Sequence, residues 1–315
     1  MNRRTRLAFL LLLAWPLLAV AEPAVPTAQR AVLVTGASTG IGRRITERLA
    51  ADGYFVFAGA RKPEDLKSLG GPKNVQAVRL DVTRQDEIDA VADLIGKSGR
   101  GLYGLVNNAG IGTVGTVADM KPEEFDLLMA VNLYGPYRMT RAVEPLIVAA
   151  KGRVVNIGSI SGIGFSSNLM AYSMSKHALE AFSESLFLQL KDSGATASIV
   201  EPGNYNSDIG KNAIQRLGAD AKALQDRGYR LAADRSRYKE PDEVADAVEK
   251  ALFEPDPKRR YLVTPNQDEA EWAVSSLIGQ LVQLNEGQRY TYSRDQLVKM
   301  LDEALAHARG RTSEP

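Results

Sequence analysis

The chain has 315 residues, and 39 lysine and arginine side chains nearly balance 38 aspartate and glutamate side chains, giving a formal net charge of +1. A chain of this length can bury a sizeable core, and charges of both signs scattered along it argue against a nucleic-acid-binding surface. With no cysteine and two histidines, disulfide frameworks and thiol nucleophiles are excluded and no metal site is predicted, so we expect chemistry from oxygen acids, amines or a bound cofactor.

The first 21 residues are arranged like a targeting segment. Three arginines precede the apolar run 7–21, which ends in Ala19-Val20-Ala21. A basic start, a short apolar run and a small-residue end are typical of a cleaved secretory signal, and an uncleaved membrane anchor is the alternative. Either arrangement places the body outside the cytoplasm, with a cytoplasmic body as the remaining alternative. We predict membrane contact through this segment only, and a linker over residues 22–29.

From Arg30 onward, short β-branched runs alternate with helical patterns. The predicted strands are Ala31–Thr35, Phe55–Ala60, Val75–Leu80, Leu102–Asn107, Arg153–Ile157, Thr196–Val200 and Arg260–Val263. The predicted helices cover about residues 41–51, 84–97, 122–150, 170–192 and 241–253. Apolar strands that alternate with helices indicate a parallel sheet covered on both faces. We therefore predict the α/β class, with one doubly wound, Rossmann-type domain over residues 30–265.

Two regions interrupt this alternation. Residues 205–238 are polar, charged and helix-prone, and they follow a strand directly. Ligands of such sheets bind at the carboxyl ends of the strands, so an insertion at that edge predicts a substrate lid, with a surface helix pair as the alternative. Residues 266–315 continue past the last strand as two helical patterns, which we predict to form a C-terminal helical extension.

A glycine-rich turn follows the first strand in the run Thr35-Gly-Ala-Ser-Thr-Gly-Ile-Gly42. Glycines here let the backbone turn tightly and approach a pyrophosphate, which then sits on the free N–H groups of the next helix. The spacing G-x-x-x-G-x-G differs from the generic G-x-G-x-x-G fingerprint, and a turn without ligand is the alternative. The residues of this turn predicted to contact a cofactor are Gly36, Ser38, Thr39, Gly40, Ile41 and Gly42.

The second predicted strand ends at Ala60-Arg61. An NAD site places an acid near this position for the ribose hydroxyls, whereas an arginine suits the 2′-phosphate of NADP. Arg61, helped by Arg43, therefore favours NADP(H) over NAD(H). A solvated surface charge is the alternative for Arg61.

The third and fourth predicted strands end in residues that suit a nucleotide cleft. Asp81 can accept a hydrogen bond from an adenine amino group or cap the following helix, and the sequence does not separate these roles. Asn107-Asn108-Ala109-Gly110 can fix the sheet edge and line the cleft, although alone it is a turn signal. The residues predicted here to contact the cofactor are Asp81, Val82, Asn108, Ala109 and Gly110.

Tyr172 and Lys176 are the pair best suited to proton transfer. They lie four residues apart in a helical pattern, which places the phenol and the ammonium on one face. A phenol has a reference pKa of about 10, and a neighbouring cation favours the phenolate and brings that pKa toward the working range. Such a pair also occurs by chance, so its meaning depends on the motifs around it.

Together these motifs resemble the short-chain dehydrogenase/reductase family. The glycine turn, the Asn-Asn-Ala-Gly run, Asn132, Ser159, the Tyr172–Lys176 pair and Pro202-Gly203 occur in that family's order and approximate spacing, over about residues 30–263. The resemblance implies a seven-stranded Rossmann-type sheet and hydride transfer between NAD(P) and an alcohol or carbonyl. It also implies a homodimer or homotetramer paired through the helices predicted at 122–150 and 170–192.

The resemblance also implies residue roles. Tyr172 would give or take the hydroxyl proton, and Lys176 would lower its pKa and hold the nicotinamide ribose. Ser159 would hydrogen-bond the substrate oxygen as it becomes alkoxide-like; a serine that caps a turn is the alternative. Asn132 would hold a proton-relay water, and Pro202 and Gly203 would lie beside the nicotinamide.

Two departures from the family pattern bear on function. The family often has a threonine after Pro202-Gly203, where this chain reads Asn204-Tyr-Asn-Ser207, so Ser207 is a candidate substitute. Glu201 and Arg61 resemble the branch that acts on steroids, retinoids and similar apolar alcohols, and we expect His177 to be structural.

We predict an NADP(H)-dependent oxidoreductase that interconverts a secondary alcohol and a ketone on an apolar or mixed-polarity small molecule. The alternatives are a non-catalytic NADP(H)-binding sensor or scaffold, and an enzyme that retains the cofactor for redox-neutral epimerisation.

Overall fold

The computed structural model describes residues 30–229 and 234–310. The predicted leader and linker, residues 1–29, lie outside the described residues, as does the short stretch 230–233 of the predicted lid. Within the two described ranges, no helix has the length and apolar character needed to cross a bilayer.

The centre of the molecule is a seven-stranded parallel sheet with the strand order β3-β2-β1-β4-β5-β6-β7. Its strands are β1 (Ala31–Val34), β2 (Phe55–Ala60), β3 (Val75–Arg79), β4 (Gly104–Asn107), β5 (Arg153–Ile157), β6 (Thr196–Pro202) and β7 (Arg260–Val263). The predicted sheet is therefore confirmed, with small differences in strand bounds. β4 begins at Gly104 rather than at Leu102, and β6 continues to Pro202, which lies beside Val263 of β7.

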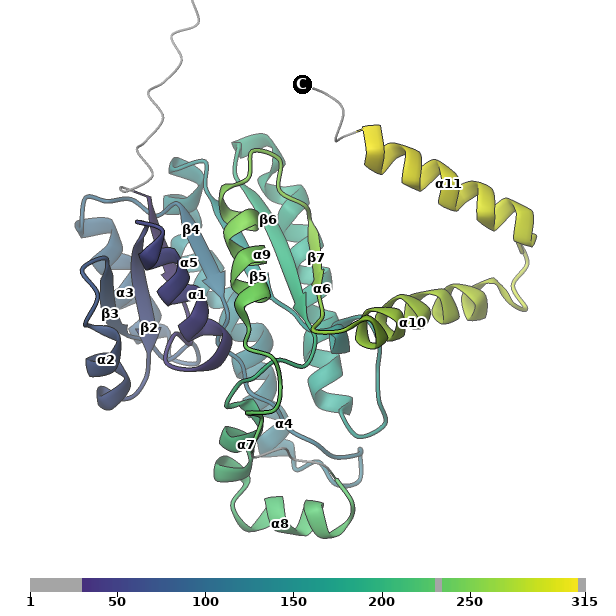
Figure 1. Ribbon diagram of the computed structural model, residues 1–315, viewed down its shortest axis with the longest axis horizontal. Coiled ribbons are helices and arrows are strands. Elements are labelled where there is room, and N and C mark those ends of the chain that lie inside the picture. Colours follow the sequence, from purple (N-terminus) through teal and green to yellow (C-terminus); the bar gives the residue numbers. More distant parts are fainter. Residues whose placement is uncertain (1–29, 230–233, 311–315) are drawn as a thin grey trace, which may run out of the picture.

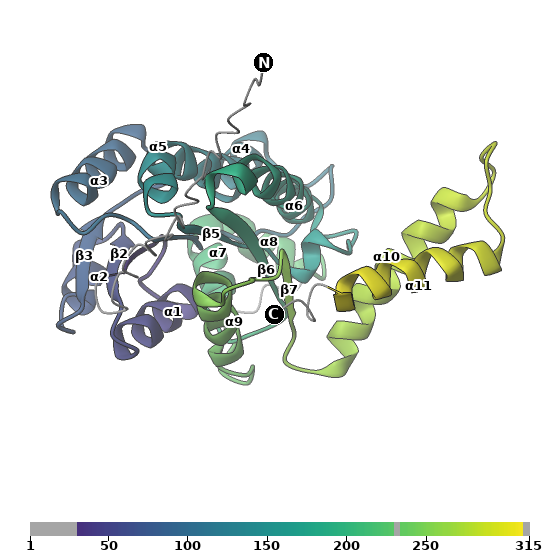
Figure 2. The same ribbon diagram turned by 90° about the horizontal axis from the view of Figure 1, so that it is seen from above.

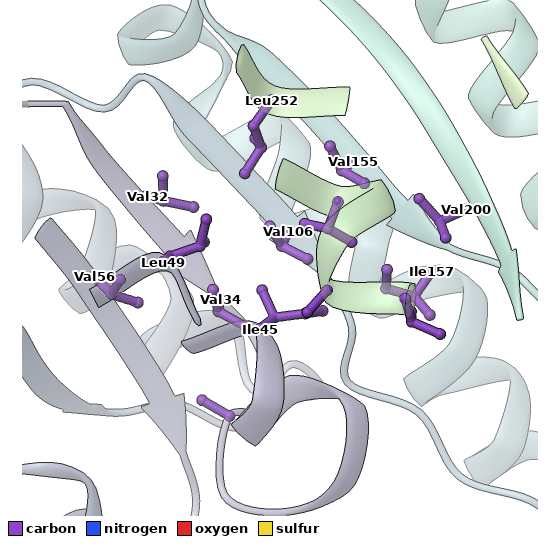
Figure 3. Close-up of a cluster of buried hydrophobic side chains, with 14 of the residues drawn as sticks. Val32, Val34, Ile45, Leu49, Val56, Val106, Val155, Ile157, Val200 and Leu252 are labelled. Carbon is purple, nitrogen blue, oxygen red and sulfur yellow. The ribbon is translucent and has the colours of Figure 1, made fainter. Parts of the chain in front are cut away.

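Helices cover both faces of the sheet, as Figure 2 shows. One face carries α1 (Gly40–Ala51), α2 (Pro63–Leu69) and α9 (Asp242–Phe253), and the other carries α3 (Gln85–Lys97), α5 (Gly135–Ala149) and α6 (Met170–Leu190). Side chains alternate along β1, so Val32 and Val34 pack toward α1 and α9 (Figure 3), and Leu33 packs on the opposite face. Each such buried side chain stabilises the fold by about 1.5–3 kcal/mol, which fixes the sheet on which the site is built.

The predicted helix over residues 122–150 is divided in the structure. α4 (Pro122–Met129) passes through a π-helical turn, Ala130–Tyr134, into α5. Pro136 explains the break, because it has no N–H group for the carbonyl of Asn132, four residues earlier, and its ring would clash with that carbonyl in a regular α-helix. Single π-helical turns inside α-helices are frequent at functional sites.

The two interruptions of the alternating pattern both form helices. α7 (Ile209–Leu217) and α8 (Ala219–Asp226) lie beyond one end of the sheet, and α10 (Gln267–Asn285) and α11 (Arg294–Gly310) form an arm that extends away from it (Figure 1). The first part of α10 packs on the loop after β5, where Ala273 is buried against Ile160 and Ile163. The start of the C-terminal extension is therefore part of the body.

Candidate active site

A cleft of about 1710 Å³ runs across the carboxyl ends of the strands. It is lined by the loops that follow β1 to β6, by the insertion and by the first turns of α10. The predicted site residues in its wall are Gly36, Ser38, Thr39, Gly40, Ile41, Gly42, Arg61, Asp81, Val82, Asn108, Ala109, Gly110, Ser159, Tyr172, Lys176, Pro202 and Gly203. Asn132 is the predicted site residue that does not line the cleft.

The turn between β1 and α1 is pressed against the loop that follows β4. Gly36 has a φ angle of +64° and Gly40 one of +54°, a region that favours glycine. A side chain at Gly42 would collide with the carbonyl oxygen of Gly36 and the side-chain amide of Asn108. The Thr39 side chain makes no capping hydrogen bond, so the first N–H groups of α1 remain able to bind an anion. This cradle fits the pyrophosphate of a dinucleotide.

Thr35 and Asn108 lock the two loops together. The Thr35 hydroxyl accepts hydrogen bonds from the Asn108 and Ala109 N–H groups, each at 3.0 Å. The Asn108 side-chain amide in turn donates to the carbonyl oxygens of Thr35, at 2.9 Å, and Gly36, at 3.0 Å. Sequence reasoning placed Thr35 in the strand and missed this role, because the two loops lie far apart along the chain.

The neighbouring Asn107 has a different function from Asn108. It is 3% exposed, and its amide donates to Thr140 Oγ1 at 3.1 Å and to Asn156 Oδ1 at 2.8 Å. Asn156 then donates to Ser183 Oγ at 2.8 Å. These bonds join β4, β5, α5 and α6 inside the core, so one amide of the Asn-Asn pair fixes the sheet and the other lines the cleft.

Arg61 lies beside Asp81 at the end of the cleft formed by the loops after β2 and β3. Its side chain is 58% exposed, and its Nη1 atom is 3.9 Å from Asp81 Oδ2. Asp81 does not cap α3; its Oδ1 atom accepts from the Thr83 N–H at 2.9 Å, and Arg84 is the N-cap residue. Arg43 is held by Glu47 at 2.6 Å. Arg61 is therefore the better placed of the two predicted arginines to meet a phosphate.

Tyr172, Ser159 and Lys176 meet farther along the cleft. The Ser159 hydroxyl accepts from the Ser161 N–H at 3.1 Å, and it lies close enough to the Tyr172 phenol to lower the pKa of that phenol. Lys176 is 6% exposed, its Nζ atom donates to the Ile157 carbonyl at 2.8 Å, and it lies 5.7 Å from the centre of the Tyr172 ring. Tyr172 and Lys176 lie on α6 and Ser159 lies just after β5, and this placement brings the three side chains together in the cleft.

Burial changes the pKa values of Tyr172 and Lys176 in opposite directions. It raises the pKa of the Tyr172 phenol, and this effect is larger than the lowering by Ser159 and by the positive charge of Arg235. Burial lowers the pKa of the Lys176 ammonium to about 8, although the nearby carboxylate of Glu180 raises it. Tyr172 is therefore a neutral phenol able to donate a proton. The lowering of the phenol pKa by Lys176 stays a prediction.

Asn132 lies behind the cleft wall with its side chain fully engaged. Its amide donates to the Ile111 carbonyl at 2.9 Å and to Ser175 Oγ at 3.1 Å, and its Oδ1 atom accepts from the Ile111 N–H at 2.9 Å. Ser175 then donates to the Tyr172 carbonyl at 2.7 Å. In a regular helix the backbone carbonyl of Asn132 would accept from the N–H group of residue 136, but Pro136 has no N–H group. A relay water would therefore contact this carbonyl rather than the Asn132 side chain. The relay itself stays a prediction.

A buried charge cluster follows one helical turn after Lys176. Glu180 and Glu201 are 7% and 2% exposed, and Arg260 Nη1 lies 2.8 Å from Glu180 Oε2 and 2.6 Å from Glu201 Oε1. Burial raises the pKa of Glu201, and raises that of Glu180 to about 8. This cluster was not predicted from the sequence. The available signal was Glu201, a glutamate inside the apolar strand β6. A charge buried in a strand requires a partner of opposite charge.

The insertion and α10 build the wall beyond Tyr172. Arg216 of α7 donates to the Gly112 carbonyl at 2.7 Å and forms an ion pair with Glu124. At the start of α10, Glu269 accepts from the Asn204 N–H at 2.7 Å, and Trp272 lines the cleft. Ser207 also lines the cleft, beside Gly40. His177 lies outside it and bonds the Ser173 carbonyl of its own helix.

Comparisons with known proteins agree with this geometry. The family model described as short chain dehydrogenase matches residues 30–218. A solved short-chain dehydrogenase from Streptomyces avermitilis is 31% identical, with a TM-score of 0.65, over 89% of this chain and 97% of that chain.

Two curated relatives differ in how much of their length is matched. D-beta-hydroxybutyrate dehydrogenase from the mitochondria of Bos taurus is 38% identical over 57% of this chain, and the match spans only 55% of that enzyme. The uncharacterized oxidoreductase YbbO of Escherichia coli (strain K12) is 32% identical over 79% of this chain and 89% of its own length.

Proposed function

The chain belongs to the short-chain dehydrogenase family, and from this membership and its cleft we propose an NADP(H)-preferring oxidoreductase that interconverts a secondary alcohol and a ketone. The observation that carries the proposal is the meeting of Ser159, Tyr172 and Lys176 in the same cleft as the Gly36–Gly42 turn. This arrangement joins a dinucleotide cradle to a proton donor.

The residues divide the reaction between them. A bound nicotinamide supplies the hydride chemistry. In the reducing direction Tyr172 gives its phenolic proton to the substrate oxygen, and in the oxidising direction it takes the proton back. Ser159 hydrogen-bonds the same oxygen as negative charge develops. Lys176, fixed by the Ile157 carbonyl, provides the positive charge that stabilises the phenolate left behind.

The NADP(H) preference is tested by replacing Arg61 with alanine. We expect the affinity for NADPH to fall about 10- to 100-fold, because one charge-assisted hydrogen-bond partner of the 2′-phosphate is removed. The affinity for NADH should stay unchanged. Titration of both cofactors, followed by nicotinamide fluorescence, measures this. Arg100→Ala, at a residue outside the cleft that stacks on Phe55, is the matched control, and a wild-type preference for NADH would contradict the proposal.

We also propose that the leader exports the body with the cofactor already bound. The support is the charge and apolar pattern of residues 1–21. Free nicotinamide cofactor is scarce outside the cytoplasm, and export of the folded holoenzyme reconciles the leader with the cleft. Cofactor-free enzyme in the exported fraction would contradict this proposal.

The expected homodimer or homotetramer stays a prediction. Exposed aromatic and apolar side chains on the helices concerned support it, among them Tyr137 of α5 and Met174 and Leu188 of α6. Burial of such side chains is the main favourable contribution to subunit association.

A further inference from the structure

The wall of the cleft beyond Tyr172 carries two arginines that the reaction described above does not use. Arg235 and Arg237 both line the cleft, and they follow the insertion helices. Both contact the ring of Tyr238, whose centre is 4.5 Å from the Arg235 guanidinium carbon and 5.4 Å from that of Arg237. Arg237 is exposed, whereas Arg235 is partly buried, and burial makes an unpaired charge costly.

Arg235 lacks a carboxylate partner among the described residues. Its Nη2 atom donates to the neutral Asn204 Oδ1 at 3.3 Å. Its Nε atom is buried without a hydrogen-bond partner. Arg216, on the same wall, differs because Glu124 neutralises it. A half-buried guanidinium with an unused donor is a costly feature unless something binds there.

The nearby acids are occupied or exposed. Glu269 accepts from the Asn204 N–H through one oxygen and from the Asn266 amide through the other. Asp268 is exposed at the cleft wall, and Asp234 bonds the Ser236 N–H at 2.8 Å. Within the described chain, none of these three acids forms an ion pair with Arg235. The guanidinium is thus left for a molecule in the cleft.

Arg235 and Tyr172 line the same cleft, and the positive charge of Arg235 lowers the pKa of the Tyr172 phenol, against the effect of burial. A group bound to Arg235 and a carbonyl bound to Tyr172 can therefore belong to one small molecule. The cofactor phosphates have other partners, because the glycine turn fits the pyrophosphate and Arg61 lies in the loop after β2.

We propose that Arg235 binds a carboxylate of the substrate, so that the enzyme acts on hydroxy acids and oxo acids rather than on uncharged alcohols and ketones. This inference rests on the proposed function and names its substrate class. The planar guanidinium matches a carboxylate in a two-point contact, which suits both discrimination and orientation of the reacting carbon. Tyr238 stacks on the guanidinium and holds it in place.

The test measures binding and turnover separately. Octanoate and octanamide are titrated into the full-length protein with and without NADPH, and the fluorescence of Trp272, which lines the cleft, reports binding. We expect the wild type to bind octanoate about 10- to 100-fold more tightly than octanamide, as one charge-assisted contact implies. Arg235→Gln should abolish this difference while its NADPH affinity stays unchanged. Arg100→Gln, outside the cleft, should keep the difference.

Other outcomes separate the two proposals. Equal affinities for the two probes in the wild type, or a carboxylate preference that survives Arg235→Gln, would overturn the carboxylate subsite. A loss of NADPH affinity in Arg235→Gln would also overturn it, by assigning the arginine to a cofactor phosphate. Turnover of 3-oxooctanoate and its methyl ester is then compared, and a preference for the acid that disappears in Arg235→Gln supports the inference. If Arg235-dependent carboxylate binding is found but no oxo acid, ketone or alcohol is turned over, the proposed function fails instead.

Discussion

Tyr172→Phe is expected to reduce kcat by about 10²- to 10⁴-fold, because it removes the proton donor and leaves the rest of the cleft in place. The phenol ring packs in the same position, and the hydroxyl is the only atom lost. NADPH affinity should therefore remain close to that of the wild type. Steady-state turnover of a ketone or oxo acid, with a parallel NADPH titration, measures both quantities.

The control for this substitution is Tyr134→Phe, at a tyrosine that is 52% exposed and outside the cleft. It should leave kcat unchanged. A Tyr172→Phe enzyme with wild-type turnover would show that another group carries the proton. Wild-type protein that binds NADPH tightly but turns over no ketone would favour the sensor or scaffold alternative. Steady release of NADP⁺ during turnover would exclude an enzyme that retains its cofactor for redox-neutral epimerisation.

Arg260→Met is expected to lower the free energy of unfolding by about 2–4 kcal/mol near pH 8. Removal of one partner from a fully buried ion pair typically costs about 3–5 kcal/mol, and the Arg260 side chain is 42% exposed, so solvent screening reduces the loss. The cost arises because Glu180 and Glu201 then share a buried site without their cation.

The loss should be smaller at pH 5, and this pH dependence identifies its cause. Burial raises the pKa of Glu180 from 4.5 to about 8, so between these values the folded state binds more protons than the unfolded state. The stabilisation from this carboxyl is complete below about pH 4.5 and is lost as pH rises through about 8. At pH 5 Glu180 is protonated and needs no cation. The charge of Arg260 lowers this pKa, so as pH rises through 8 the variant must either carry the carboxylate charge without its cation or hold a proton that the unfolded state releases, and the loss of stability grows.

Denaturant unfolding of Arg260→Met and of Arg260→Met/Glu180→Gln at both pH values tests this account. The second substitution should recover part of the stability at pH 8 and little at pH 5, because glutamine carries no charge to compensate. Lys258→Met, at a lysine with no ion pair among the described residues, is the control. A loss that is the same at both pH values would mean that Arg260 acts through packing rather than charge.

The sequence predicted those parts of the site whose signal is local. The glycine turn, the end of β2 and the Tyr172–Lys176 spacing each lie within a few residues, and hydrophobic periodicity predicted the seven strands. Asn132 shows the limit of this reasoning. Its side-chain partners, Ile111 and Ser175, lie on other elements. The helix predicted over residues 122–150 was wrong in being continuous, and Pro136 was the available signal for its break.

The features that the sequence did not predict depend on where the chain folds back. Glu180, Glu201 and Arg260 come from α6, β6 and β7, and their meeting follows from the strand order. Arg235 is one arginine among many until the fold places it on the cleft wall. The lid and the boundary at residue 265 stay predictions, although the first turns of α10 line the cleft and so share in the site.

The strand order has a consequence for how the protein is made. β1 lies between β2 and β4, with Val32 beside Gly104, so one edge of β1 stays unpaired until residue 107 has left the ribosome. At about 5–20 residues per second, that interval is on the order of 4–15 seconds. An apolar strand with an open edge is a template for wrong pairing. The edge of β1 is therefore open to wrong pairing during this interval, before the loops after β4, β5 and β6 complete the cleft.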